Sequence, residues 1–199
     1  TRGGDADPGV DDAFARITET AGVTIDVERT SVWLFSPDRQ RLVCRSLYRR
    51  SFGRHMAGGE IDVGAFPQYI AALEKTRAID ASDAQNDPRT RELTGGYLVP
   101  LGITSMLEAT VRTDAGALAG VVCHEHVGPM RQWLLDEKSF AASVADMVAR
   151  ALADDRQRRL RAALEHSEKR YRTYVAISTE GILGAEFDPP VPTSLSLDE

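Results

Sequence analysis

The fold is decided by residues 105–128, SMLEATVRTDAGALAGVVCHEHVG, in which two apolar runs flank a short polar turn. The turn, TDAG at residues 113–116, has the composition that closes a β-hairpin. Residues 29–48, RTSVWLFSPDRQRLVCRSLY, show the same arrangement around a turn at residues 36–40. Two hairpins in one chain predict a mostly antiparallel sheet.

Helices are predicted on both sides of these hairpins along the chain. Residues 10–22 carry apolar side chains at helical spacing, and Gly22 suits the position just past a helix end. Residues 66–76 predict a second helix with a proline in its first turn, and residues 50–65 read as a glycine-rich loop. Residues 77–93 predict a short strand, an acidic turn and a helix that begins near Asp87-Pro88. This order of elements predicts an α+β fold.

The first strand of the sheet has apolar side chains on both faces, with Val32 and Leu34 on one and Trp33 and Phe35 on the other. A strand of this kind is covered on both sides, which leaves room for a pocket on one of them. A small-molecule pocket combines aromatic walls with a few polar groups. The candidates that the sequence offers are Trp33, Phe66, Tyr69, Tyr97, Ser105 and Glu108.

Two of these candidates have specific alternatives. Trp33 and Phe66 could belong to the hydrophobic core instead. Glu108 interrupts an apolar strand, so it either faces the pocket with a partner or lies at an exposed sheet edge.

A long helix is predicted from Asp136, because apolar residues recur at helical spacing to about residue 170. Such a helix is roughly 50 Å long, at ~1.5 Å per residue. A domain of this size is only ~35–40 Å across, so the helix is expected to extend beyond it. We expect Leu160 and Leu164 to be covered by the same helix of a second subunit, in a parallel coiled coil.

Composition limits the class of protein. The 199 residues are 42% hydrophobic and 27% charged, as in an ordinary globular protein. The net charge of −6 argues against a general affinity for nucleic acid or anionic lipid. No apolar run approaches the ~20 residues of a membrane span, and the N-terminus has no secretory signal pattern. We therefore expect a cytoplasmic protein that binds neither nucleic acid nor membranes.

Residues 78–93, AIDASDAQNDPRTREL, and 97–152, from YLVPLGITSMLEATV to ADMVARAL, closely resemble a GAF domain. The resemblance is strongest to GAF domains of bacterial sensor histidine kinases and cyclic-di-GMP signalling proteins, and it extends over about residues 10–153. Residues 167–190, SEKRYRTYVAISTEGILGAEFDPP, resemble the start of a PAS domain. The remaining residues are too few for a complete PAS core, so we expect a fragment of a longer protein.

The resemblance implies a domain organisation and a function. We expect a disordered leader at residues 1–9, a GAF-like sensory domain at 10–153, a signalling helix at 154–170 and an incomplete PAS-like segment at 171–199. GAF domains dimerise through their terminal helices, hold a small molecule or chromophore between sheet and loops, and bias an output domain. A non-catalytic sensory module with an unidentified ligand is therefore expected, within a parent protein such as a histidine kinase or a diguanylate cyclase. A GAF domain that serves only as a ligand-free dimerisation spacer is an alternative.

A second alternative is a thiol- or metal-dependent protein centred on Cys123, His124 and His126. Strand alternation places the two histidines on one face, and Cys123 on the other, which argues for hydrogen-bonded histidines at a strand end rather than a metal site. The histidines would then tie the following loop to the sheet. In a GAF-like sheet the first strand would lie between Cys44 and Cys123, which would put the two thiols too far apart for a disulfide. Neither cysteine falls in a bilin-attachment motif, while haem ligation by either histidine stays open.

Overall fold

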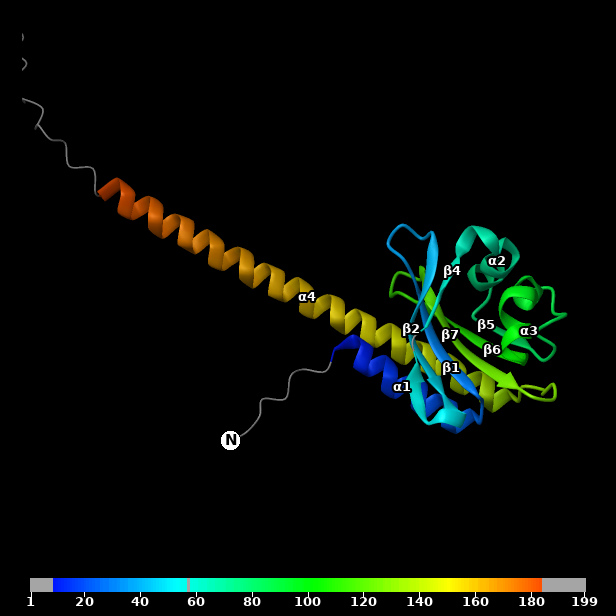
Figure 1. Cartoon of the computed structure of the whole chain (residues 1–199). Coiled ribbons are helices and arrows are strands. Elements are labelled where there is room, and N and C mark those ends of the chain that lie inside the picture. The colour runs from blue at the N-terminus through cyan, green and yellow to red at the C-terminus, as the bar shows by residue number, and fades with distance from the viewer. Residues whose placement is uncertain (1–8, 57, 184–199) are drawn as a thin grey trace, which may run out of the picture. The chain divides into compact units, whose positions relative to one another are not determined.

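The structure is a computed structural model that describes residues 9–56 and 58–183, with side chains described as far as Val175. Among these residues seven strands form one sheet, in the order β3-β2-β1-β7-β6-β5 with β4 also paired to β2 (Figure 1). Every pairing is antiparallel, as predicted. The strands are β1 (Arg29–Phe35), β2 (Arg41–Arg49), β3 (Arg54–Met56), β4 (Glu60–Asp62), β5 (Ala78–Ala81), β6 (Ile103–Arg112) and β7 (Leu118–Val127).

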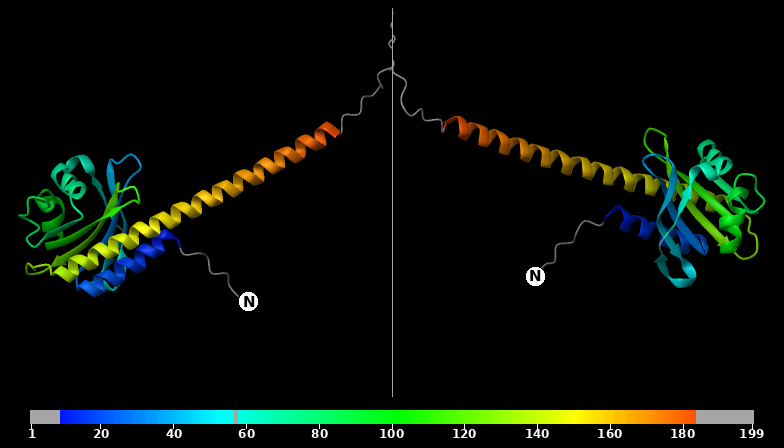
Figure 2. Two further views of the ribbon diagram at one scale, coloured as in Figure 1. Left: turned by 180° about the vertical axis from the view of Figure 1, so that it is seen from behind. Right: turned by 45° about the horizontal axis from the view of Figure 1, so that its top comes forward.

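Helices cover both faces of this sheet within the compact unit that ends at Asp155. Figure 2 shows α1 (Val10–Ile25) beside α4 (Leu135–Leu183) on one face. The opposite face is covered by α2 (Pro67–Lys75), by the single turn α3 (Val99–Leu101) and by connecting loops. The predicted α+β architecture is confirmed.

Strand alternation divides the interior into two apolar clusters. The cluster under α1 and α4 includes Phe14, Val32, Leu107, Val122 and Val144. The cluster on the other face includes Trp33, Tyr69, Met106, Val121 and Cys123. Strand β1 contributes to both, which confirms that it is covered on both sides.

Two glycines permit close packing of the backbone. At Gly22 a Cβ atom would lie 2.9 Å from Thr30 Oγ1, so the glycine lets α1 approach β1. The helix therefore continues past Gly22 to Ile25 and ends at Asp26, which has a left-handed conformation (φ 59°). The prediction that Gly22 follows the helix end was wrong, because this glycine serves packing rather than termination. At Gly120 a Cβ atom would lie 2.1 Å from the Trp33 carbonyl oxygen.

Two loop regions differ from the predictions. Residues 50–65, expected as a loop, contain the short strands β3 and β4, which extend the sheet beyond β2. The helix expected near Asp87-Pro88 is replaced by turns, a 3-10 turn at Arg91–Leu93 and a π turn at Thr94–Leu98. Threonine hydroxyls donate to loop carbonyls here, Thr90 to Ala84 (2.6 Å) and Thr94 to Gln85 (2.9 Å), and these bonds hold an irregular backbone in place.

Helix α4 continues beyond the predicted end near residue 170, to Leu183. Glu137 accepts a hydrogen bond from the Leu134 amide (2.8 Å) and so satisfies one donor at the helix start. In the unit that begins at Arg156, every described side chain is exposed, including Leu160 and Leu164. No helix among the described residues is long and apolar enough to cross a membrane. The predicted leader, apart from Gly9, and the PAS-like residues 184–199 lie outside the described residues.

Candidate functional site

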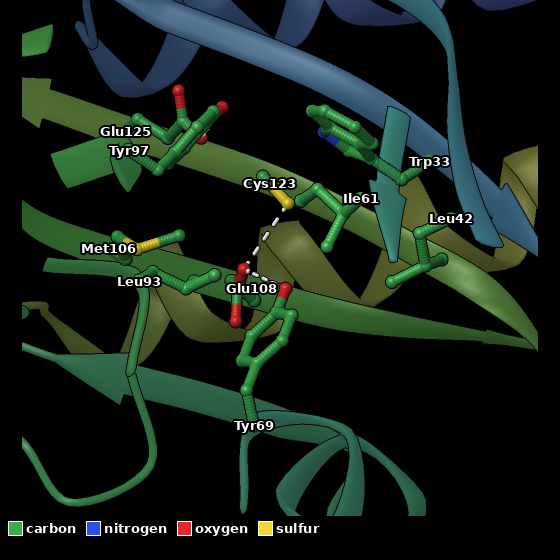
Figure 3. A pocket seen from close by; sticks show the side chains of 10 residues that line it. All are labelled: Trp33, Leu42, Ile61, Tyr69, Leu93, Tyr97, Met106, Glu108, Cys123 and Glu125. Atoms are coloured by element: carbon green, nitrogen blue, oxygen red, sulfur yellow. Dashed lines mark hydrogen bonds between the residues drawn. The ribbon is translucent and has the colours of Figure 1, made fainter. Parts of the chain in front are cut away.

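A small cavity lies on the sheet face opposite α1 and α4, between the strands, α2 and the π turn (Figure 3). Its volume is about 10 Å³, close to the space of a single water molecule. Strands β6 and β7 contribute alternate residues to it, because residues two apart share a face. The lining side chains are Trp33, Leu42, Ile61, Tyr69, Leu93, Tyr97, Met106, Glu108, Cys123 and Glu125.

Glu108 is the central polar residue of this cavity and is fully buried. Its Oε1 accepts hydrogen bonds from the Tyr69 hydroxyl (2.7 Å) and from the Cys123 thiol (3.3 Å). Its Oε2 has no hydrogen-bond partner. Burial raises the pKa of Glu108 to about 7, although the bonds from Tyr69 and Cys123 act in the opposite direction. The carboxyl group is therefore divided between its neutral and charged forms near pH 7.

Tyr69 is held in position by the way α2 begins. The first turn of a helix has free backbone N–H groups. Those of Gln68 and Tyr69 both donate to Glu92 Oε2, each at 2.9 Å. Glu92 lies in the 3-10 turn before the π turn, so this contact fixes α2 against the segment that also supplies Tyr97.

A second buried acid, Glu125, has a hydrogen-bond partner for each of its two carboxyl oxygens. Its Oε2 accepts a hydrogen bond from Arg29 Nε at 2.6 Å, and its Oε1 accepts one from the Tyr97 hydroxyl at 2.7 Å. Arg29 Nη2 also donates to the Tyr97 hydroxyl (3.3 Å). Burial alone would lower the pKa of Arg29, but Glu125 and Tyr97, through charge and hydrogen bonds together, outweigh it and the pKa is raised. Arg29 and Glu125 thus form a buried ion pair beside the cavity.

A larger depression adjoins the cavity on its outer side. Its volume is about 330 Å³, and Trp33, Ile61 and Tyr97 line both it and the cavity. Arg29 and Arg49 also face it, together with the backbone of Gly58 and Gly59. These three shared side chains therefore lie between the two spaces.

The structure brings together four of the six predicted pocket residues: Trp33, Tyr69, Tyr97 and Glu108. Phe66 packs, partly buried, against the same apolar cluster but does not line the cavity. Ser105 faces the other side, where its hydroxyl donates to the Ser82 carbonyl (2.7 Å) and accepts from the Arg131 amide (2.9 Å). Residues 105 and 108 are an odd number of positions apart, so they cannot share one face of a regular strand.

Arg29, Cys123 and Glu125 are site residues that the sequence reasoning did not place in the pocket. Cys123 lies directly opposite Glu108 in the β6–β7 ladder. The ladder shifts register between Val111 and Arg112, so the hairpin turn alone does not give this pairing. Arg29 meets Glu125 through the β1–β7 pairing, which joins distant parts of the chain and leaves no local trace in the sequence.

The two histidines of β7 lie on the sheet face that α1 and α4 cover, away from the cavity. His124 is fully buried, and its Nδ1 lies 3.1 Å from the Leu107 carbonyl oxygen of the neighbouring strand. Burial lowers the pKa of His124 to about 4, and its Nε2 has no partner. His126 is half-buried beside the following loop, where burial and the charge of Arg131 lower its pKa. The prediction that both histidines tie this loop to the sheet was therefore wrong for His124.

Neither the thiols nor the histidines form a metal site in the described part of the chain. No group of three or more histidine, cysteine or acidic side chains is placed there to hold a metal ion. Cys44 and Cys123 are free thiols on β2 and β7, with β1 between these two strands. Burial raises the pKa of Cys44 to about 11 and also raises that of Cys123. Both thiols are thus protonated at neutral pH, which disfavours nucleophilic reactivity.

The sheet and the helices on its two faces define an α+β domain with a cavity on one face. The family model described as "GAF domain" matches residues 9–152. The chain belongs to the GAF family, as the sequence resemblance predicted. No curated protein matches the chain.

Solved structures show the same fold. The blue-light absorbing form of the Thermosynechococcus elongatus PixJ GAF domain superposes with a TM-score of 0.63 and 16% identity, covering 79% of this chain and 91% of that one. The phycocyanobilin-bound GAF domain of a cyanobacterial phytochrome gives 0.63 and 16%, with 76% and 88% covered. The GAF domain of a phosphoenolpyruvate-protein phosphotransferase from Coxiella burnetii gives 0.61 and 15%, with 77% and 88% covered. At these identities the likeness concerns the fold.

Proposed function

We propose that this chain is a non-catalytic sensory module that binds a small molecule in the cavity around Glu108 and regulates an output domain. The observation that carries the proposal is the buried Oε2 of Glu108, which has no partner inside a cavity walled by aromatic side chains. A buried polar atom without a partner costs free energy, so a ligand that satisfies it stabilises the fold. One of the similar structures is described as the blue-light absorbing form of a GAF domain, and another as a phycocyanobilin-bound GAF domain.

The module would transmit its signal as a homodimer through its terminal helices. The α1–α4 surface carries an apolar groove of about 350 Å³ that includes Ile17, Phe140, Val144 and Met147. In the second unit, the exposed Leu160, Leu164, Tyr171 and Tyr174 fall at heptad spacing. A ligand could then act by binding two arrangements of the helix pair with unequal affinity. We place the module in the cytoplasm, before a PAS domain of a parent protein such as a sensor histidine kinase.

Native mass spectrometry of the purified protein tests the binding proposal. We expect a bound molecule of a few hundred daltons that is released on denaturation. The Glu108→Gln variant should retain less of this molecule. Glu74→Gln is the matched control, because Glu74 is an exposed acid on α2 with no contact to the cavity. A protein that carries no small molecule, and whose unfolding temperature does not respond to a panel of cellular metabolites, would contradict the proposal.

The small size of the cavity supports one competing function. A volume of about 10 Å³ also suits a ligand-free domain that only holds two chains together. The two functions differ in one outcome: a spacer dimerises but binds nothing in the pocket. The thiol or metal protein centred on Cys123 and His124 has no such support, because these two side chains lie on opposite faces of the sheet.

A further inference from the structure

The charges around the cavity do not balance. Two buried acids, Glu108 and Glu125, face it. Among the side chains that line the cavity and the depression, one guanidinium bonds to an acid of this pair. It is that of Arg29, which pairs with Glu125. The partners of Glu108 are the uncharged donors Tyr69 and Cys123. A buried carboxylate without a cationic partner carries a large desolvation penalty. An incoming cation would remove this penalty, whereas an incoming anion would increase it.

The walls of the cavity also suit a positive charge. Trp33 and Tyr97 pack edge to face, with ring centroids 6.3 Å apart and an interplanar angle of 79°. Tyr69 supplies a third ring next to Glu108. Aromatic faces attract organic cations, most strongly where water is excluded. A buried acid surrounded by three aromatic rings is therefore a recognisable arrangement for a flat cation.

We propose that the pocket selects a small, flat organic cation, such as an amidine or a guanidine, whose N–H groups donate to Glu108 Oε2 and whose body lies against Trp33 and Tyr97. This inference rests on the proposed function, since it names the ligand class of the same site. The present cavity holds no more than a water molecule. Such a ligand enters from the adjoining depression when Ile61 and Tyr97, which line both spaces, move aside.

Three probes of the same shape test the charge preference: benzamidine (cationic), benzamide (neutral) and benzoate (anionic). The readout is the indole N–H resonance of Trp33, followed by NMR during titration. Trp133 provides an internal control, because it packs in the other apolar cluster, across the sheet. We expect benzamidine to shift the Trp33 resonance saturably, with an affinity at least about tenfold above those of benzamide and benzoate. The Trp133 resonance should not move.

Variants then assign the preference to Glu108. Glu108→Gln keeps the size of the side chain but removes the charge, and should weaken benzamidine binding about tenfold or more. Tyr69→Phe, which retains the acid, should preserve the preference for benzamidine over benzoate. Glu74→Gln should have no effect. Thermal unfolding of each variant shows whether it is folded, and Tyr69→Phe keeps the proposal testable if Glu108→Gln does not fold.

The outcomes separate this inference from the proposed function. If the three probes bind at Trp33 with equal affinity, or benzoate binds best, the pocket binds small molecules but the cation preference is wrong. Unchanged benzamidine affinity in Glu108→Gln would likewise overturn the role of the acid. If no probe perturbs Trp33 while native mass spectrometry shows a retained molecule, the ligand class is wrong and the sensory function stands.

Discussion

Cys123 and Glu108 face each other directly across the β6–β7 ladder, and the thiol of the first donates to the carboxyl group of the second at 3.3 Å. This contact explains how an acid is tolerated in an apolar strand. The thiol and the Tyr69 hydroxyl satisfy one carboxyl oxygen, and the other has no partner. The ladder thus positions the acid, and its neighbours provide hydrogen bonds to only one of its two carboxyl oxygens.

The stability contributed by Glu108 should fall as pH rises. Its pKa is about 7 in the folded chain against an ordinary value of 4.5, so the folded state binds more protons between these limits. The free energy of unfolding of the wild type, relative to Glu108→Gln, should therefore decrease between pH 4.5 and 7, by on the order of 3 kcal/mol, and level off above. Urea unfolding of both proteins at several pH values measures this difference. A constant difference would show that Glu108 is not buried as described.

His124 should have the opposite effect. Its pKa is about 4 in the folded chain against 6.5 ordinarily, so the unfolded state binds more protons between these values. Stability should be lost as pH falls from 6.5 to 4, by on the order of 3 kcal/mol, and a His124→Asn variant should lose less over the same range. The half-buried His126 provides the control, because His126→Asn should change the pH dependence less. Equal effects of the two substitutions would contradict the burial of His124.

Neither thiol should react readily in the folded protein. At pH 7.5, with iodoacetamide, we expect Cys44 and Cys123 to be alkylated at least about a hundredfold more slowly than in urea, because burial raises both pKa values. Mass spectrometry of timed samples gives the two rates separately. Rapid modification of native Cys123 would instead favour a thiol-dependent activity.

The proposed dimerisation through α4 predicts that charged substitutions on one face of the helix separate the two chains. Leu160 and Leu164 share one face of the helix and are exposed, so Leu160→Glu combined with Leu164→Glu should convert a dimer to a monomer in sedimentation experiments. Ala162→Glu introduces the same side chain on the opposite face and should leave the dimer intact. A wild type that is monomeric at tens of micromolar would refute dimerisation through this helix.

Gly120 should tolerate no side chain. A Cβ atom there would lie 2.1 Å from the Trp33 carbonyl oxygen and 3.0 Å from the Leu34 Cα, and a strand backbone cannot yield as a side chain does. Gly120→Ala should therefore cost about 3 kcal/mol or more of unfolding free energy. Gly96→Ala is the control, since nothing lies within 4 Å of its added atom. A small effect at Gly120 would mean that β1 and β7 are less closely paired.

The sequence predicted those parts of the fold that depend on local pattern. Both hairpins, α2 and the long helix followed from turn composition and apolar spacing. The extent of α1 did not, because Gly22 is read locally as a terminator while its role depends on Thr30 and Tyr48 of distant strands. In the site, the sequence left two alternatives for Glu108, a partnered position in the pocket or an exposed sheet edge. Its burial shows that the first holds.

The partners of the site residues were harder to predict. Pairing between β1 and β7 brings Arg29 to Glu125 across about half of the sequence, and no local pattern encodes such a register. Ser105 was assigned to the pocket by residue type alone. Its distance from Glu108 along the strand already placed the two on opposite faces.

Consecutive residues of β7 serve two different layers of the domain. Cys123 and Glu125 face the cavity, whereas Val122 and His124 face the helices. Substitutions at the odd-numbered positions would therefore alter the cavity wall, while the even-numbered positions keep the contact with α1 and α4. One strand can thus accept changes on its cavity side without losing its packing against α1 and α4.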